Sequence, residues 1–124
     1  MPATAKKRIV IKVGTNLLLD KALKKGIFSQ LADSIKKLSD YELILVSSGA
    51  IALGNLELKQ KFKHEDDIMR NVSAVVGQSD LITAYKQVLG NKVGQVLITK
   101  QDLMNRESYL HIKKVIEYML DHSI

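Results

Sequence analysis

Apolar residues along the chain fall into short continuous runs and into spaced sets that recur every three or four positions. Continuous runs at residues 9–14, 43–46 and 93–99 are rich in Val, Ile and Leu and predict three strands. The first run ends at Gly14 and predicts a strand buried on both faces, with Lys12 as the exception. These runs supply the sheet of the predicted fold.

Helical spacing marks the segments that follow each strand. The apolar stripes, in chain order, span Phe28–Leu38, Ile51–Leu53, Met69–Leu89 and Ile112–Leu120. Ser29 is placed to cap the first helix, and Gly77 falls within the third, a long or broken helix, where we expect a neighbour to pack closely. The polar segment 55–67 predicts a surface excursion between two helices.

This alternation of strands and helices predicts an α/β fold, a parallel sheet with helices on both faces and right-handed crossovers. The length of 124 residues suits one domain. Three strands make a narrow sheet whose edges need covering, and the last predicted helix ends at Leu120, where the next strand is expected. We therefore expect either a fragment or a unit that another copy completes.

Composition excludes several classes of site. Cysteine is absent, which excludes disulfides, thiolate metal sites and cysteine nucleophiles and favours a reducing cytoplasm. The apolar stretches are far shorter than the ~20 residues that span a membrane, and no cleavage site follows the basic N-terminus. We therefore expect a cytoplasmic protein with no membrane partner.

The net charge of +6 comes mainly from the N-terminal part of the chain, where nine basic and two acidic residues occur up to Lys37. The aromatic residues are not interleaved with this basic part, as a surface that stacks on bases would require. We therefore expect solvated lysines and no nucleic-acid partner.

Polar residues follow two of the predicted strands, in Lys12–Asn16 and Ser47–Ala50. Ligands of parallel sheets bind outside the carboxyl ends of the strands, where glycines and helix N-termini offer N–H groups to anions. An unpaired lysine inside an apolar strand is costly to bury, so Lys12 either contacts a phosphate or lies at a solvated edge. Both clusters predict an anion site.

Standard catalytic motifs do not account for these clusters. Gly49 and Gly54 have the spacing of a P-loop, but Asn55-Leu56 replaces the required Lys-Ser/Thr, and no G-x-G-x-x-G occurs. Ser48 lacks the G-x-S-x-G context of a hydrolase nucleophile, and the three histidines lack the spacing of zinc ligands. We therefore predict neither a serine triad nor a metal site.

Five segments together resemble the amino-acid kinase family, and within it the glutamate 5-kinases, in the right order and over the whole chain. They are Val10–Asn16, Val46–Gly54, Val75–Ser79, Gln95–Thr99 and Arg106–Tyr109. The resemblance implies transfer of the γ-phosphoryl group of ATP to the side-chain carboxylate of L-glutamate, with Mg²⁺, giving glutamyl 5-phosphate at the first step of proline synthesis. It also implies a homo-oligomer at full length.

The same resemblance assigns roles to residues of both strand-end clusters. Lys12 is the implied catalytic residue and holds ATP phosphates, with Gly14 and Thr15 adding backbone and hydroxyl contacts. The residues implied to bind glutamate are Ser48, Gly49, Ala50, Gly77 and Gln78.

Three departures from the family pattern remain, one of which is a short, lysine-rich loop between Leu56 and Asp67. Residues 69–73 replace the alanine-rich run that usually precedes Val-Gly-Gln, and the acidic and asparagine-rich strand that should follow Ile124 is not in the chain. The resemblance thus implies that residues 1–124 are the N-terminal, substrate-binding part of the kinase domain, without its nucleotide-binding half and inactive alone. Another carboxylate or carbamate kinase, or a non-catalytic basic binding module, are the alternatives.

Overall fold

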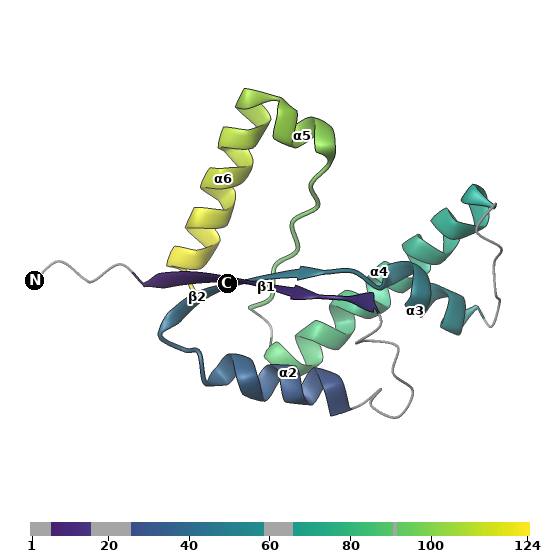
Figure 1. Cartoon of the computed structure of the whole chain (residues 1–124), viewed down its shortest axis with the longest axis horizontal. Helices are drawn as coiled ribbons and strands as arrows, with labels where there is room; N and C mark the ends of the chain where they lie inside the picture. Colours follow the sequence, from purple (N-terminus) through teal and green to yellow (C-terminus); the bar gives the residue numbers. More distant parts are fainter. Residues whose placement is uncertain (1–5, 16–25, 59–65, 91) are drawn as a thin grey trace, which may run out of the picture.

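A parallel pair of strands forms the centre of the structure. The computed structural model describes residues 6–15, 26–58, 66–90 and 92–124. Strand β1 (Lys7–Val13) pairs with β2 (Tyr41–Ser47) in a register that sets Lys7 against Tyr41 and Val13 against Ser47. Helix α2 (Gly26–Lys36) lies between them in the chain (Figure 1). The first two predicted strands and the α/β class are therefore confirmed.

In the described residues after β2 there are four helices, α3 (Ala50–Glu57), α4 (Asp67–Leu89), α5 (Lys100–Met104) and α6 (Arg106–Asp121). The long helical pattern forms one unbroken helix, α4, which begins where the Asp66 side chain accepts a hydrogen bond from the Met69 N–H. The capping prediction for Ser29 is wrong, because α2 begins earlier, at Gly26. Asn16, the lysines of 21–25 and the segment 59–65 of the expected excursion lie outside the described residues.

The core lies between one face of the sheet and helices α2 and α4. Its buried residues are Val13, Phe28, Leu81 and Tyr85. The rings of Phe28 and Tyr85 meet edge to face, with centroids 5.3 Å apart. This packing fixes α4 against the carboxyl end of β1, where the predicted anion site lies.

Helices α3 and α4 touch through their backbones at two glycines. A Cβ atom on Gly77 would lie 1.8 Å from the carbonyl oxygen of Ala50, and one on Gly54 would lie 1.9 Å from that of Ser73. No side chain fits at such distances. The close neighbour expected at Gly77 is thus confirmed, and it is the first turn of α3.

The third predicted strand is wrong. Residues 93–99 join no sheet in the described part of the chain, and Leu97 is 76% exposed. An apolar run forms a strand only when a neighbouring strand offers hydrogen-bond partners. Strands β1 and β2 pair with each other, and the segment 93–99 runs away from them toward α5 (Figure 1).

The second face of the sheet is not packed, contrary to the expectation for β1. Val10 is 61% exposed, Val46 is 51% exposed, and Lys12 is exposed as well. Helices lie on both sides of the sheet (Figure 1), but α6 contains no buried residue. The last helix is therefore confirmed, while its apolar stripe, including the exposed Val115, is not an inner one.

Candidate functional site

The turn from β2 into α3 exposes backbone donors. Gly49 adopts φ 114° and ψ −2°, a left-handed conformation that favours glycine. It is the N-cap of α3, and no side chain caps the first turn of this helix. The first N–H groups of α3 therefore have no side-chain acceptor, and they carry the positive end of the helix dipole.

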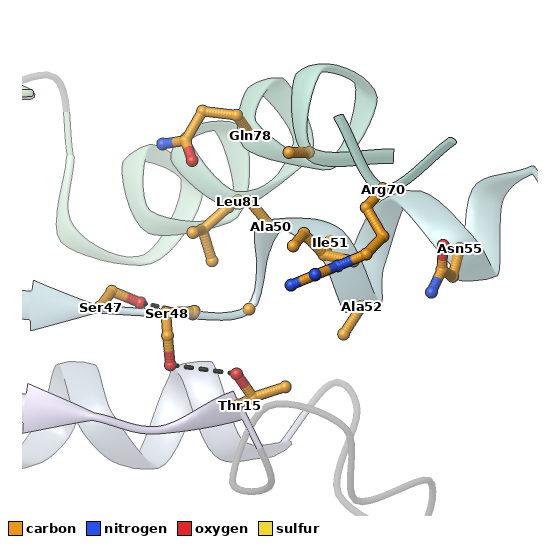
Figure 2. A pocket seen from close by; sticks show the side chains of 12 residues that line it. Thr15, Ser47, Ser48, Ala50, Ile51, Ala52, Asn55, Arg70, Gln78 and Leu81 are labelled. Carbon is orange, nitrogen blue, oxygen red and sulfur yellow. Dashed lines mark hydrogen bonds between the residues drawn. The ribbon is translucent and has the colours of Figure 1, made fainter. Parts of the chain in front are cut away.

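Hydrogen bonds from β1 hold this turn in place. The Ser48 N–H donates to the Val13 carbonyl at 3.1 Å, which extends the ladder between the two strands. The Thr15 hydroxyl donates to the Ser48 hydroxyl at 3.0 Å (Figure 2). The two strand-end clusters that the sequence singled out are thus joined directly.

Tyr85 holds the same turn from the other side. Its hydroxyl donates to the Ser47 hydroxyl at 2.7 Å, and Ser47 in turn donates to the Ser48 carbonyl at 3.1 Å. Tyr85 is 4% exposed, and its burial raises the pKa of the phenol, while the Ser47 hydrogen bond lowers it in part. The phenol is neutral at physiological pH and acts as a donor.

An open pocket of about 560 Å³ lies at the start of α3, a size typical of small-molecule sites (Figure 2). Its lining residues are Thr15, Ser47, Ser48, Gly49, Ala50, Ile51, Ala52, Asn55, Arg70, Ala74, Gln78 and Leu81. Five residues of the sequence-based site are therefore brought together, namely Thr15, Ser48, Gly49, Ala50 and Gln78. Their roles stay predictions.

The other three predicted site residues lie outside this lining. Lys12 is exposed on β1, and Gly14 is half-buried just beyond its end. Gly77 is buried against α3, where its missing side chain lets the Ala50 backbone approach. Gly77 therefore supports the pocket through packing.

Arg70 and Asn55 line the pocket but were not predicted as site residues. The signal for Arg70 was present, because Arg70, Ala74 and Gln78 recur every four residues and share one face of the predicted helix. Asn55 gave no such signal, and its Oδ1 atom is buried without a hydrogen-bond partner in the structure.

The described pocket fits an anion. Its polar groups are hydroxyls, backbone N–H groups, two amides and a guanidinium, and no carboxylate lines it. Within the described ranges no group of three or more His, Asp or Glu side chains could hold a metal ion. These residues do not fit Mg²⁺, which prefers carboxylate oxygens.

None of the helices described in the chain has the length and apolar character needed to cross a bilayer.

Comparison with known families identifies the class. The sequence profile of the amino acid kinase family matches residues 7–124. The chain therefore belongs to the amino acid kinase family, as its motifs and its α/β fold indicated.

Within that family the chain is similar to proteins named glutamate 5-kinase. It is 38% identical to the one from Bacteroides thetaiotaomicron over 94% of this chain and 34% of the relative. The identity is 34% to the one from Geobacter sulfurreducens and 37% to the one from Shewanella amazonensis, each over 95% of this chain. The chain spans about a third of the length of these relatives, 34% and 33% for the last two.

Proposed function

We propose that the chain is the acceptor-binding part of an ATP-dependent kinase that phosphorylates the side-chain carboxylate of L-glutamate. The observation that carries the proposal is the uncapped first turn of α3, which opens into a pocket lined by donors. The relatives named glutamate 5-kinase support glutamate as the acceptor. The product would be glutamyl 5-phosphate, an intermediate of proline synthesis.

Phosphoryl transfer to a carboxylate brings two anions together, so the site must supply donors and positive charge. The N–H groups of Gly49 and Ala50 would hold the acceptor carboxylate. The Ser48 hydroxyl, which accepts a hydrogen bond from Thr15, would add a third donor, and Gln78 would border the same ligand. Backbone donors of this kind need no rearrangement when charge develops.

The phosphates of ATP would lie at the end of β1. Lys12 would supply positive charge, and Gly14 and Thr15 would supply backbone and hydroxyl contacts. Thr15 borders the acceptor pocket and touches Ser48, so it would lie where the two substrates meet. ATP provides the transferred phosphoryl group, and Mg²⁺ is expected only in company with ATP. We place the reaction in the cytoplasm and expect a homo-oligomer at the full length of the relatives.

Titration calorimetry of the chain tests the acceptor assignment. We expect L-glutamate to bind more tightly than L-aspartate or N-acetylglutamate, which are acceptors suited to other amino-acid kinases. Preference for one of those two compounds would reassign the member of the family. Binding of RNA with a steep salt dependence, without glutamate binding, would favour the basic binding module instead.

Two glycine variants locate the binding site. Gly49→Ala is expected to weaken glutamate binding, because alanine disfavours the left-handed turn that aims the first N–H groups of α3. Gly90→Ala is the matched control, since Gly90 has φ 89° with open space around it and does not line the pocket. Equal effects of the two variants on glutamate affinity would contradict the assignment.

Turnover is a separate test. Phosphoryl transfer depends mainly on positioning both substrates, and the chain spans about a third of its relatives. A coupled assay for ADP with ATP, Mg²⁺ and L-glutamate is therefore expected to show no glutamate-dependent turnover by these 124 residues. Measurable turnover by the monomer would show that the acceptor-binding part is sufficient.

A further inference from the structure

A series of hydrogen bonds connects the core to the pocket. The Tyr85 hydroxyl on α4 donates to the Ser47 hydroxyl at 2.7 Å, and the Ser47 hydroxyl donates to the Ser48 carbonyl at 3.1 Å. Ser47 and Ser48 line the pocket, whereas Tyr85 is 4% exposed and is not among the described lining residues. A residue without access to the ligand is thus linked to the wall of the pocket.

The carbonyl at the end of this series belongs to the peptide group that joins Ser48 to Gly49. The C=O and N–H groups of a trans peptide lie in one plane and point in opposite directions. A hydrogen bond that holds the Ser48 carbonyl therefore also sets the direction of the Gly49 N–H group. Among the described residues, no hydrogen bond engages this N–H group, so it is available to a ligand.

The orientation of this peptide group is not fixed by its neighbours in the turn. Gly49 has φ 114°, and a glycine can change φ and ψ at little steric cost. The hydroxyl of Thr15 binds the hydroxyl of Ser48, which holds the Ser48 side chain and not its carbonyl. The hydrogen bond from Ser47 is therefore the side-chain contact that restrains the peptide group.

The Tyr85 hydroxyl decides where the Ser47 proton points. A serine hydroxyl has one proton and rotates to suit its partners. Because the Ser47 oxygen accepts from Tyr85, its own proton is left for the Ser48 carbonyl. Tyr85 is a fixed donor, since its ring is buried and meets Phe28 edge to face, with centroids 5.3 Å apart.

From these contacts we infer that Tyr85 is a positioning residue, whose hydroxyl acts through Ser47 to orient the Gly49 N–H group toward the acceptor carboxylate. The inference rests on the proposed function, in which this N–H group binds the carboxylate. Donors that are already oriented bind a ligand without the cost of ordering them. Loss of the Tyr85 hydroxyl therefore weakens acceptor binding, although Tyr85 touches no ligand.

A double-mutant cycle on ligand affinity tests the inference. NMR titration with L-glutamate is carried out on the unchanged chain, Tyr85→Phe, Ser47→Ala and the double variant. We expect each single variant to weaken glutamate binding about 5-fold, the value of one neutral hydrogen bond. The double variant should be no weaker than the weaker single variant, because either change breaks the same series.

Two controls separate positioning from general stability. Val88→Ala trims a partly buried side chain of the same core without touching the hydrogen bonds, and Tyr109→Phe removes an exposed phenol on α6. Both should leave glutamate affinity within about 2-fold. In the free chain, the amide signal of Gly49 should shift in Tyr85→Phe and in Ser47→Ala but stay in place in Val88→Ala, a pattern that a purely structural role would not produce.

The outcomes distinguish the inference from the proposed function. Unchanged glutamate affinity in a folded Tyr85→Phe chain, or additive losses in the double variant, would overturn the inference and leave the proposed function intact. An equal loss in Val88→Ala would also overturn the inference alone, because reduced stability would then explain the effect. Absence of glutamate binding by the unchanged chain would overturn the proposed function, and the inference with it.

A further variant covers the case in which Tyr85→Phe does not fold. Ser47→Thr keeps the hydroxyl that links Tyr85 to the Ser48 carbonyl, whereas Ser47→Ala removes it. Ser47→Thr is expected to retain most of the glutamate affinity that Ser47→Ala loses. A loss in Ser47→Thr as large as that in Ser47→Ala would contradict the role of the hydroxyl series.

Discussion

The two ends of the chain fold by different means. In residues 6–15, 26–58 and 66–90, side chains far apart in the sequence pack together, as Val13, Phe28 and Leu81 do in the core. In residues 92–124, no residue is buried. In this C-terminal part, Val93 packs against the edge of the core and Gly94 lies beside Met119, but helices α5 and α6 are capped by residues close to them in the sequence.

Side chains close in the sequence cap the helices of the C-terminal part. Thr99 and Asp102 form a reciprocal capping box at the start of α5, and Asn105 caps α6 by accepting from the Ser108 N–H. Tyr118 stacks on His122 one turn later. Capping residues therefore form helices even where no residue is buried. The apolar run 93–99 would need a neighbouring strand to form a strand, and it remains outside the sheet.

Residues 6–15, 26–58 and 66–90 form the N-terminal body. The largest effect is expected from a substitution at the closest contact in this body, where Gly77 of α4 meets Ala50 of α3. Gly77→Ala forces a Cβ atom against the Ala50 carbonyl and should lower the free energy of unfolding by about 3 kcal/mol or more. Chemical denaturation followed by circular dichroism measures this. Gly94→Ala is the C-terminal control, because its Cβ would meet only side-chain atoms, those at the ends of Met119 and Ile124, and no backbone. Similar losses of unfolding free energy in the two variants would contradict the difference in packing between the two ends of the chain.

A smaller loss of stability is expected when the hydrogen bond between Tyr85 in the core and Ser47 at the pocket is removed. Tyr85→Phe removes the donor to Ser47 and should cost about 1 kcal/mol of unfolding free energy. Tyr109→Phe, on α6 and 47% exposed, should cost almost nothing. An equal cost for the two would show that the buried bond does not contribute.

The same tyrosine makes a prediction about pH. Burial raises the pKa of Tyr85 in the folded chain, so folding favours the protonated phenol. This contribution is fully present below the ordinary pKa of about 10 and is lost as the pH rises through the raised value. Denaturation midpoints above pH 10 should fall more steeply for the unchanged chain than for Tyr85→Phe.

The smallest effect is confined to α5. Hydrogen bonds from Thr99 lower the pKa of Asp102, so this cap is present above the ordinary carboxyl pKa of about 4 and is lost as the pH falls through the lowered value. Asp102→Ala should abolish amide protection in α5 in hydrogen-exchange measurements. The unfolding midpoint of the body should stay unchanged, and a global loss of stability would contradict the separation of the two ends.

The sequence anticipated what depends on local pattern and missed what depends on tertiary partners. The helical spacing of 69–89 sufficed to predict α4, and Gly77 within it was rightly expected at a close contact. The spacing of residues 93–99 could not reveal that no strand pairs with them. The joining of Thr15 to Ser48 followed from the parallel sheet, because carboxyl ends of neighbouring parallel strands meet at one edge.

The residue that supplies positive charge to the pocket was harder to predict from the sequence. Lys12 drew attention because a lysine inside an apolar strand is unusual, yet β1 has one exposed face, and Lys12 lies exposed there without a burial cost. Arg70 was not predicted as a site residue. Only the packing of α4 on α3 brings Arg70 to the pocket wall.

The most direct test of the account is an NMR titration of the ¹⁵N-labelled chain with L-glutamate, read at the backbone amides. We expect saturable shifts that are largest at Gly49 and Ala50, because these N–H groups would hold the acceptor carboxylate. Saturable shifts centred on another part of the chain, or none at Gly49 and Ala50, would contradict the claim that the start of α3 binds the acceptor.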